Sequence, residues 1–158
     1  MRLALYQPDI PQNTGAMLRL AACFGLAVDV IEPCGFVLDD KRMRRVGMDY
    51  LEHVELKRHS SWDAYLSWRS ASIDGRLILL TTQAALPYAE AAYRPTDSLL
   101  VGQESAGVPD AVRNVADLAV RIPMRPGLRS LNVAMAAAIV AAEAMRQTGF
   151  TQTGFSGT

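Results

Sequence analysis

The sequence predicts an α/β domain, a mainly parallel β-sheet with helices on both faces. Its 158 residues match the usual size of a single domain. Short apolar segments alternate along the chain with segments of helical spacing, which indicates parallel strands joined by helices. The segment at residues 77–80 is apolar without interruption, which is typical of a strand buried on both faces.

The first half of the chain follows this alternation. A strand is expected at residues 3–6, and Pro8 and Pro11 force a loop after it. Asn13 or Thr14 can cap the helix that follows, and Gly25 ends that helix. The next expected elements are a strand at 27–31, a short helix beginning at Asp39 and Asp40, a weak strand at 54–56, a helix opened by Ser60 or Ser61, and the strand at 77–80.

The second half continues the same pattern to residue 149. The expected elements are a helix at 87–93, a strand at 99–101, a short helix with Pro109 in its first turn, a strand at 118–122 and a long helix at 130–146 that Gly149 ends. We therefore predict one domain over residues 1–149. The Gly-, Ser- and Thr-rich segment 150–158 is expected to be a flexible tail.

Composition excludes several classes of protein. Sixteen basic residues balance sixteen acidic ones, and no basic tail is present for nonspecific binding of nucleic acid. No apolar run reaches the roughly 18 residues of a membrane span, and the first ten residues do not resemble a signal peptide. Cys23 and Cys34 form no CxxC pair, so we expect no disulfide framework, no bound metal and a reducing, cytoplasmic setting.

Two kinds of residue that often carry chemistry have plainer interpretations here. His53 and His59 have no partner at metal-ligand spacing and are expected at the surface. Cys23 and the pair Trp62 and Trp68 follow helical spacing and are expected in the core.

Arginine accounts for 14 of the 16 basic residues, and the basic residues cluster. One cluster lies within residues 41–45, and another comprises Arg121, Arg125 and Arg129 in the stretch 118–142, which has no acidic residue. Because guanidinium groups bind phosphate with two hydrogen bonds, such clusters indicate contacts with phosphate. Genomic composition is an equal alternative for any single arginine.

Three loops that are expected to follow strands contain unusual residues. Ligands in such folds bind at the carboxyl ends of the strands, which draws attention to these loops. They contain Asn13-Thr14-Gly15 with Arg19 one turn later, the segment 102–109 with Gly102, Glu104 and Gly107, and the segment 122–132 with Ser130, Leu131 and Asn132. Taken singly, each loop has a structural alternative: a helix cap with a solvated arginine, a tight turn with a surface glutamate, and a second cap in which Ser130 begins the long helix.

Taken together and in this order, the three loops resemble the signature motifs of the SPOUT methyltransferases. The resemblance extends through residues 31–36, 39–50 and 80–82 and covers residues 2–149. It is greatest to the small single-domain tRNA (cytidine/uridine-34-2′-O)-methyltransferases, which modify the wobble ribose of the anticodon.

The resemblance implies a SPOUT α/β-knot, in which the C-terminal part of the chain forms a trefoil knot. It also implies S-adenosyl-L-methionine as cofactor, the anticodon stem-loop of a tRNA as partner, and a homodimer. The long helix suits a dimer independently, because residues 133–142 are apolar on nearly every side and such a helix must be covered all round.

The resemblance also assigns roles to particular residues. Arg19 would act at the ribose and phosphate, either as a base or as a positioning group, and its guanidinium stays protonated, which favours positioning. Asn13 and Asn132 would orient the hydroxyl or Arg19, and Glu104 would hold Arg19 or backbone amides. The implied cofactor contacts are Leu80, Gly102, Ile122 and Ser130, with Thr82, Gly107, Met124 and Leu131 as further contributors. Contacts with RNA phosphates are implied for Lys41, Arg42, Arg44 and Arg45.

Three positions depart from the family pattern. Gln12 and Gln103 stand where proline is usual, and Ala142 stands where a tyrosine is usual before Glu143. The last departure bears on the expected dimer or RNA contact. Alternative functions are methylation of another tRNA or rRNA ribose, a non-catalytic RNA-binding dimer, and a nucleotide-binding module of the flavodoxin kind.

Overall fold

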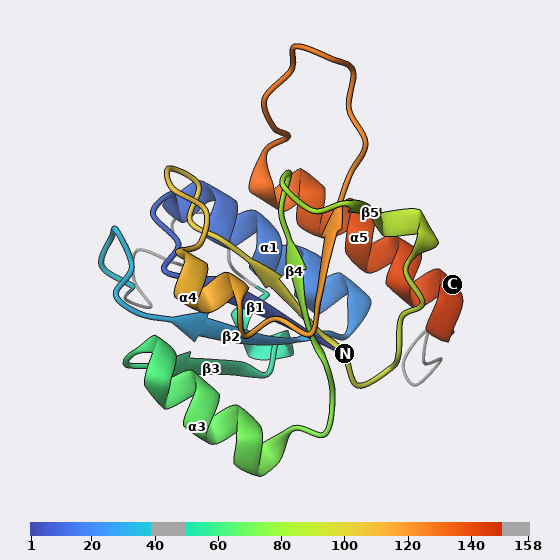
Figure 1. Ribbon diagram of the computed structural model, residues 1–158. Helices are drawn as coiled ribbons and strands as arrows, with labels where there is room; N and C mark the ends of the chain where they lie inside the picture. Colours follow the sequence, from blue (N-terminus) through green and yellow to red (C-terminus); the bar gives the residue numbers. More distant parts are fainter. Residues whose placement is uncertain (39–49, 150–158) are drawn as a thin grey trace.

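The computed structural model describes residues 1–38 and 50–149, and in this part of the chain seven strands form one parallel sheet (Figure 1). The strand order is β3-β2-β1-β6-β4-β7-β5. The strands are β1 (Arg2–Tyr6), β2 (Ala27–Ile31), β3 (Leu56–His59), β4 (Leu77–Leu80), β5 (Leu86–Pro87), β6 (Ser98–Val101) and β7 (Leu118–Arg121). The predicted α/β class with a parallel sheet is therefore confirmed.

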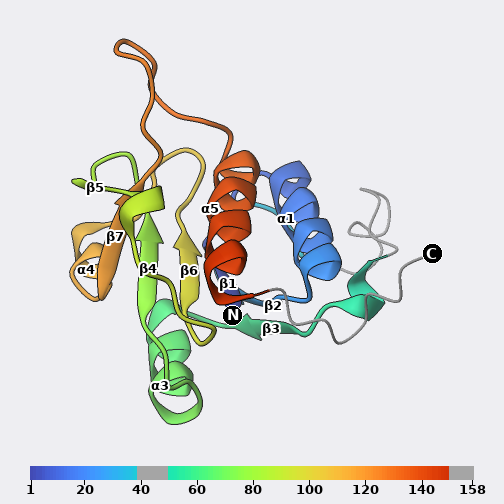
Figure 2. The same cartoon turned by 90° about the vertical axis from the view of Figure 1, so that its right-hand side faces the viewer.

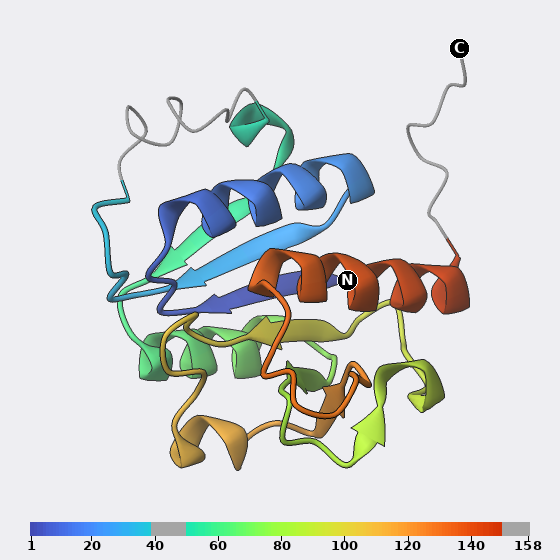
Figure 3. The same cartoon turned by 90° about the horizontal axis from the view of Figure 1, so that it is seen from above.

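Helices cover both faces of the sheet (Figures 2 and 3). The α-helices are α1 (Pro11–Phe24), α3 (Trp62–Ser72), α4 (Asp110–Arg113) and α5 (Val133–Thr148), and the 3-10 helices are η1 (Leu51–His53) and η2 (Tyr88–Glu90). Helices α1 and α5 lie side by side on one face, and α3 and α4 lie on the other. No helix in residues 1–38 and 50–149 is long and apolar enough to span a membrane.

Alternating side chains of the strands supply the two cores. On β1, Leu3 and Leu5 pack under α1 and α5, whereas Ala4 and Tyr6 pack toward α3. Strand β6 lies at the centre of the sheet, and Leu99, Leu100 and Val101 are all almost completely buried. Because parallel strands expose their carboxyl ends at one edge, the loops after β1, β4, β6 and β7 all emerge there (Figure 1).

Two predicted helix starts are wrong. Helix α1 begins at Pro11, with Ile10 rather than Asn13 or Thr14 at the cap position, because proline suits the first turn and needs no N–H partner. Helix α5 begins at Val133 rather than Ser130, since the Asn132 side chain accepts hydrogen bonds from the N–H groups of Ala134 and Met135. The predicted caps at Ser61 and Gly25 are confirmed.

Two segments also differ from the predicted elements. Strand β3 lies at 56–59 rather than 54–56, because it is an edge strand whose exposed Lys57 and Arg58 hide the apolar pattern. Residues 87–93 are not a continuous helix: β5 ends at Pro87, η2 covers Tyr88–Glu90, and residues 91–93 form no helix. The Tyr93 N–H donates to the Gln147 side chain on α5.

Two single residues are placed differently from the prediction. Cys23 is exposed, because the buried stripe of α1 runs through Thr14, Met17, Leu18 and Ala21 and passes it by. His59 is 4% exposed rather than on the surface. It is buried because its Nε2 lies 2.8 Å from Oδ1 of the fully buried Asp29, which also pairs with Arg2.

Candidate active site

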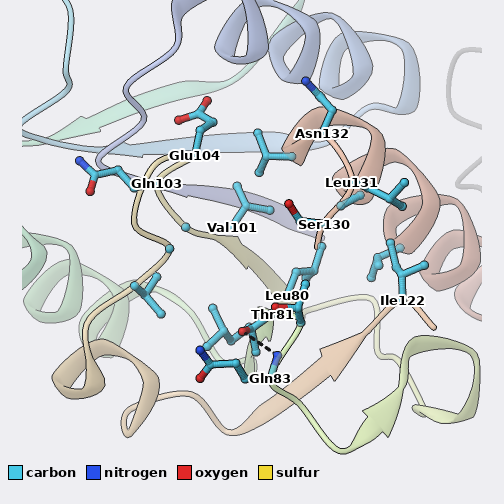
Figure 4. Close-up of a pocket in the computed structure, with 18 of the residues that line it drawn as sticks. Leu80, Thr81, Gln83, Val101, Gln103, Glu104, Ile122, Ser130, Leu131 and Asn132 are labelled. Atoms are coloured by element: carbon cyan, nitrogen blue, oxygen red, sulfur yellow. Dashed lines mark hydrogen bonds between the residues drawn. The ribbon is translucent and has the colours of Figure 1, made fainter. Parts of the chain in front are cut away.

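A cavity of about 530 Å³ lies at the carboxyl edge of the sheet, where the loops after β4, β6 and β7 meet the start of α5 (Figure 4). Its volume falls in the range of sites that bury a small organic ligand. All eight residues predicted to contact a cofactor line it: Leu80, Thr82, Gly102, Gly107, Ile122, Met124, Ser130 and Leu131. The tertiary structure thus brings together residues from three loops that are up to 51 positions apart in the sequence.

The loop after β6 needs both of its glycines. Gln103 and Gly107 exchange two backbone hydrogen bonds, of 2.9 and 2.8 Å, which closes the segment between them into a tight loop. Gly107 has φ +68°, a conformation that L-residues rarely adopt. A Cβ on Gly102 would lie 2.6 Å from the carbonyl carbon of Gly107, so only glycine lets the two backbones approach this closely.

The walls of the cavity are mainly apolar, with polar groups at particular places. Leu80, Val101, Ile122 and Val140 contribute aliphatic surface. Among the described residues that line the cavity, the charged ones are Glu104 and Arg113. The same part of the chain contains no group of three or more His, Cys, Asp or Glu that could hold a metal ion.

Arg113 is the positively charged residue among the described residues that line the cavity. One of its terminal nitrogens donates a hydrogen bond to Oε1 of Gln83, which also lines the cavity. Its Nε is buried and has no hydrogen-bond partner among the residues that the structure describes. A guanidinium with an unused buried donor is suited to an anionic group of a ligand.

A chain of hydrogen bonds links the first, second and third loops. Nδ2 of Asn13 donates to Oε1 of Glu104 at 3.2 Å, and Nδ2 of Asn132 donates to Oδ1 of Asn13 at 2.8 Å. Oδ1 of Asn132 in turn caps α5. Asn13, Glu104 and Asn132, all predicted to act at the site, therefore form one continuous hydrogen-bonded arrangement, and all three line the cavity. Figure 4 shows Glu104 and Asn132 at the cavity wall.

Glu104 receives further hydrogen bonds from the first loop. Its Oε2 accepts from the backbone N–H of Asp9 at 2.9 Å, so Glu104 holds a backbone amide and Asn13 rather than Arg19. Burial raises the pKa of Glu104, and the neighbouring Asp9 carboxyl raises it further. The contact with Glu104 lowers the pKa of Asp9.

Arg19 lies apart from this group. It is exposed on α1 and does not line the cavity, and its guanidinium carbon lies 5.0 Å above the ring of Tyr50. It lies six helical positions after Asn13, which places it about 9 Å farther along the helix axis and about 120° away around it. The predicted RNA contacts Lys41, Arg42, Arg44 and Arg45 lie outside the described residues.

Sequence reasoning missed three polar residues of this region: Asp9, Gln83 and Arg113. Asp9 carries one local signal, a carboxylate placed four residues before Asn13 in the loop after a strand. Gln83 and Arg113 carry none, because their pairing joins the loop after β4 to α4 across 30 positions.

Comparison with known proteins assigns the chain to a family. The SpoU rRNA Methylase family matches residues 1–142. A protein of Beijerinckia indica described as tRNA (cytidine(34)-2′-O)-methyltransferase is 56% identical over 147 residues, which are 93% of this chain and 91% of that protein. A protein of Ancylobacter novellus with the same description is 48% identical and covers 98% of both chains.

Solved structures agree with this assignment. A structure described by the words "2-OH methylation of C/U34 on tRNA" has a TM-score of 0.85 and 39% identity over 92% of this chain and 94% of its own. The SpoU methyltransferase AviRb of Streptomyces viridochromogenes, in complex with AdoMet, has a TM-score of 0.83 and 28% identity over 93% of this chain and 60% of its own. The chain belongs to the SpoU methylase family.

Proposed function

We propose that this protein transfers a methyl group from S-adenosyl-L-methionine to the 2′-hydroxyl of the ribose at position 34 of a tRNA. The observation that carries the proposal is that residues of all three motif loops, namely Asn13, the segment 102–107 and the segment 122–132, line one cavity. The function described for the relatives, which match nearly full length, supports the choice of nucleotide.

The residues of the cavity fit the methyl donor. An adenosine needs apolar walls and backbone edges, which Leu80, Ile122 and the glycine loop at 102–107 provide. The amino-acid end of the donor needs a cation for its carboxylate, and Arg113 is suited to that task. When bound, S-adenosyl-L-methionine supplies an electrophilic methyl group that needs no metal ion for activation.

The residues of the chain must then position a weak nucleophile. A ribose hydroxyl is scarcely ionised at neutral pH, so the rate depends on orientation and on stabilising the charge that develops on its oxygen. Asn13 and Asn132 each hold a second amide N–H besides the one used in their mutual chain. These N–H groups would donate to the ribose oxygen while its proton passes to solvent, its bond to the methyl carbon forms and the bond from that carbon to sulfur breaks, which leaves S-adenosylhomocysteine. Glu104 holds the amide of Asn13 directly, and Asn13 holds that of Asn132.

Arg19 would bind phosphate of the tRNA. Its guanidinium is exposed and stacked on Tyr50, and no salt bridge joins it to an acidic residue within residues 1–38 and 50–149. Arg121, Arg125 and Arg129 are also exposed, at the end of β7 and on the loop that projects from the sheet (Figure 1). These four exposed guanidinium groups offer contacts with tRNA phosphates outside the cavity.

A second copy of the chain would complete the functional unit. Apolar side chains around the start of α5 are exposed: Leu128 by 67%, Leu131 by 40% and Met135 by 61%. Exposed aliphatic groups gathered at one place are typical of a protein contact. Sedimentation of the purified protein should give twice the mass of the chain, and Met135→Asp should shift it toward the monomer.

Methyl transfer from labelled S-adenosyl-L-methionine to tRNA that lacks the wobble 2′-O-methyl group tests the proposed function directly. The expected product is a 2′-O-methyl pyrimidine at position 34, identified by nucleoside mapping. Label at another nucleotide would support the 2′-O-methyltransferase activity but contradict position 34 as the site of methylation. Binding of RNA without any transfer would favour the non-catalytic alternative. Arg19→Ala should raise the KM for tRNA, and Arg19→Lys should give a KM between those of the alanine variant and the wild type.

A further inference from the structure

Asp9 lies in the loop between β1 and α1 and does not line the cavity. Its backbone N–H donates to Oε2 of Glu104 at 2.9 Å, and its own Oδ1 accepts from the backbone N–H of Glu104 at 3.1 Å. Its Oδ2 accepts from the hydroxyl of Ser105. Each carboxylate thus holds the other residue's amide, which fixes the first loop to the second.

A third loop closes around Asp9. The N–H of Gly35, in the segment after β2, donates to the carbonyl of Pro8 at 2.9 Å. A Cβ at position 35 would lie 2.6 Å from Cβ of Asp9 and 2.9 Å from its Cα, so the two backbones are in close contact. Asp9 is therefore seated among the loops after β1, β2 and β6.

The donors and acceptors of the hydrogen bonds between Glu104 and Asn13 and between Asn13 and Asn132 are fixed. The carboxylate oxygen Oε1 of Glu104 can only accept here, so Asn13 must present its NH₂ group to Glu104 and its oxygen to Asn132. Asn132 must then present its NH₂ group to Asn13 and its oxygen to the start of α5. The position of the Glu104 carboxylate therefore determines the orientation of the side-chain amides of Asn13 and Asn132.

We infer that Asp9 is a positioning residue for methyl transfer: by holding Glu104 it fixes the direction of Asn13 and Asn132, whose remaining N–H groups face the acceptor oxygen. The inference rests on the proposed function, because it assigns the amides to the acceptor ribose. Asp9 itself touches neither substrate nor cofactor in this arrangement. Its effect passes through Glu104.

The charge of Asp9 gives the inference a distinctive readout. Within residues 1–38 and 50–149, the charged or titratable groups facing Glu104 are Asp9 and the Cys34 thiol, whose burial raises its pKa to about 11 and keeps it neutral. Nearby Arg58 is paired with Glu32. Because Asp9 is one cause of the raised pKa of Glu104, removal of its negative charge lowers that pKa.

Two variants separate geometry from charge. Asp9→Ala removes both acceptors, and we expect kcat to fall by about 100-fold, the order of loss that a small misplacement of reacting groups causes. Binding of S-adenosylhomocysteine should stay unchanged. Asp9→Asn keeps an acceptor for the Glu104 N–H, so it should retain most of kcat while the acid limb of the pH–rate profile moves to lower pH. Asp74→Ala, which removes an exposed carboxylate far from the site, is the matched control.

A second readout does not depend on activity. In a ¹⁵N–¹H spectrum, Asp9→Ala should shift or broaden the side-chain amide signals of Asn13 and Asn132, and Asp74→Ala should leave them in place. Unchanged amide signals together with the kcat of the control would overturn the inference. Both Asp9 variants could instead lose kcat, cofactor affinity and thermal stability to the same extent, with no shift of the pH–rate profile. That result would show that Asp9 has only a structural role. If the wild-type protein methylates no tRNA, the proposed function is wrong. The amide signals of Asn13 and Asn132 would still test whether Asp9 positions these two side chains.

Discussion

Gly102→Ala is expected to damage both the stability of the protein and its cofactor site. The added Cβ would lie 2.6, 2.8 and 2.9 Å from the carbonyl carbon, oxygen and Cα of Gly107, and all three atoms belong to backbone that cannot rotate away. The loop at 103–107 must therefore open. Its two closing hydrogen bonds, of 2.9 and 2.8 Å, are the interactions at risk.

The size of the effect follows from these contacts. Overpacking of a close contact costs about 1–3 kcal/mol, and each lost backbone hydrogen bond contributes about 1 kcal/mol within that total. For a domain of this size, such a loss lowers Tm by roughly 2–12 °C. Because Gly102 and Gly107 both line the cavity, affinity for S-adenosylhomocysteine should fall as well.

Urea unfolding and isothermal titration calorimetry measure the two effects separately. Gly25→Ala is the matched control, since Gly25 has φ +66°, a conformation that is strained for alanine, and lies where α1 ends, away from the cavity. The control should lose stability but keep its affinity for S-adenosylhomocysteine. Wild-type stability and affinity in Gly102→Ala would refute the close approach of the two loop backbones.

Three further predictions concern other parts of the molecule. Arg113→Ala should weaken binding of S-adenosylhomocysteine, which carries a carboxylate, but not of methylthioadenosine, which lacks one; equal weakening of both would contradict a carboxylate contact. Asp29→Ala should lower the free energy of unfolding by about 3–5 kcal/mol in urea titration, because it leaves the guanidinium of Arg2 without its buried partner. At pH 8 the thiolate fraction of Cys34, with a pKa of about 11, is roughly one in a thousand, so iodoacetamide should alkylate the Cys23→Ser variant far more slowly when folded than in urea. Equal alkylation rates in the two states would show that Cys34 is not shielded.

Much of the fold could be predicted because its signals are local. The uninterrupted apolar run at Leu77–Leu80 requires burial on both faces, and Gly25 ends a helix wherever that helix packs. The cofactor prediction came from the resemblance of three loop motifs, in order, to a known family, since each loop taken singly has a structural alternative. The eight residues that the resemblance implied as cofactor contacts line one cavity, and their contacts with S-adenosyl-L-methionine stay a prediction.

Other features were decided only by contacts between distant segments. The start of α5 depends on the Asn132 side chain, which is also held by Asn13 across 119 positions. His59 is buried because Asp29, on the neighbouring strand, supplies its hydrogen-bond partner. Asp9 meets Glu104 across 95 positions. A sequence determines which residues can cap, turn or pack, whereas the partner of a polar side chain depends on where the tertiary structure brings a complementary group, because hydrogen bonds act only at contact distance.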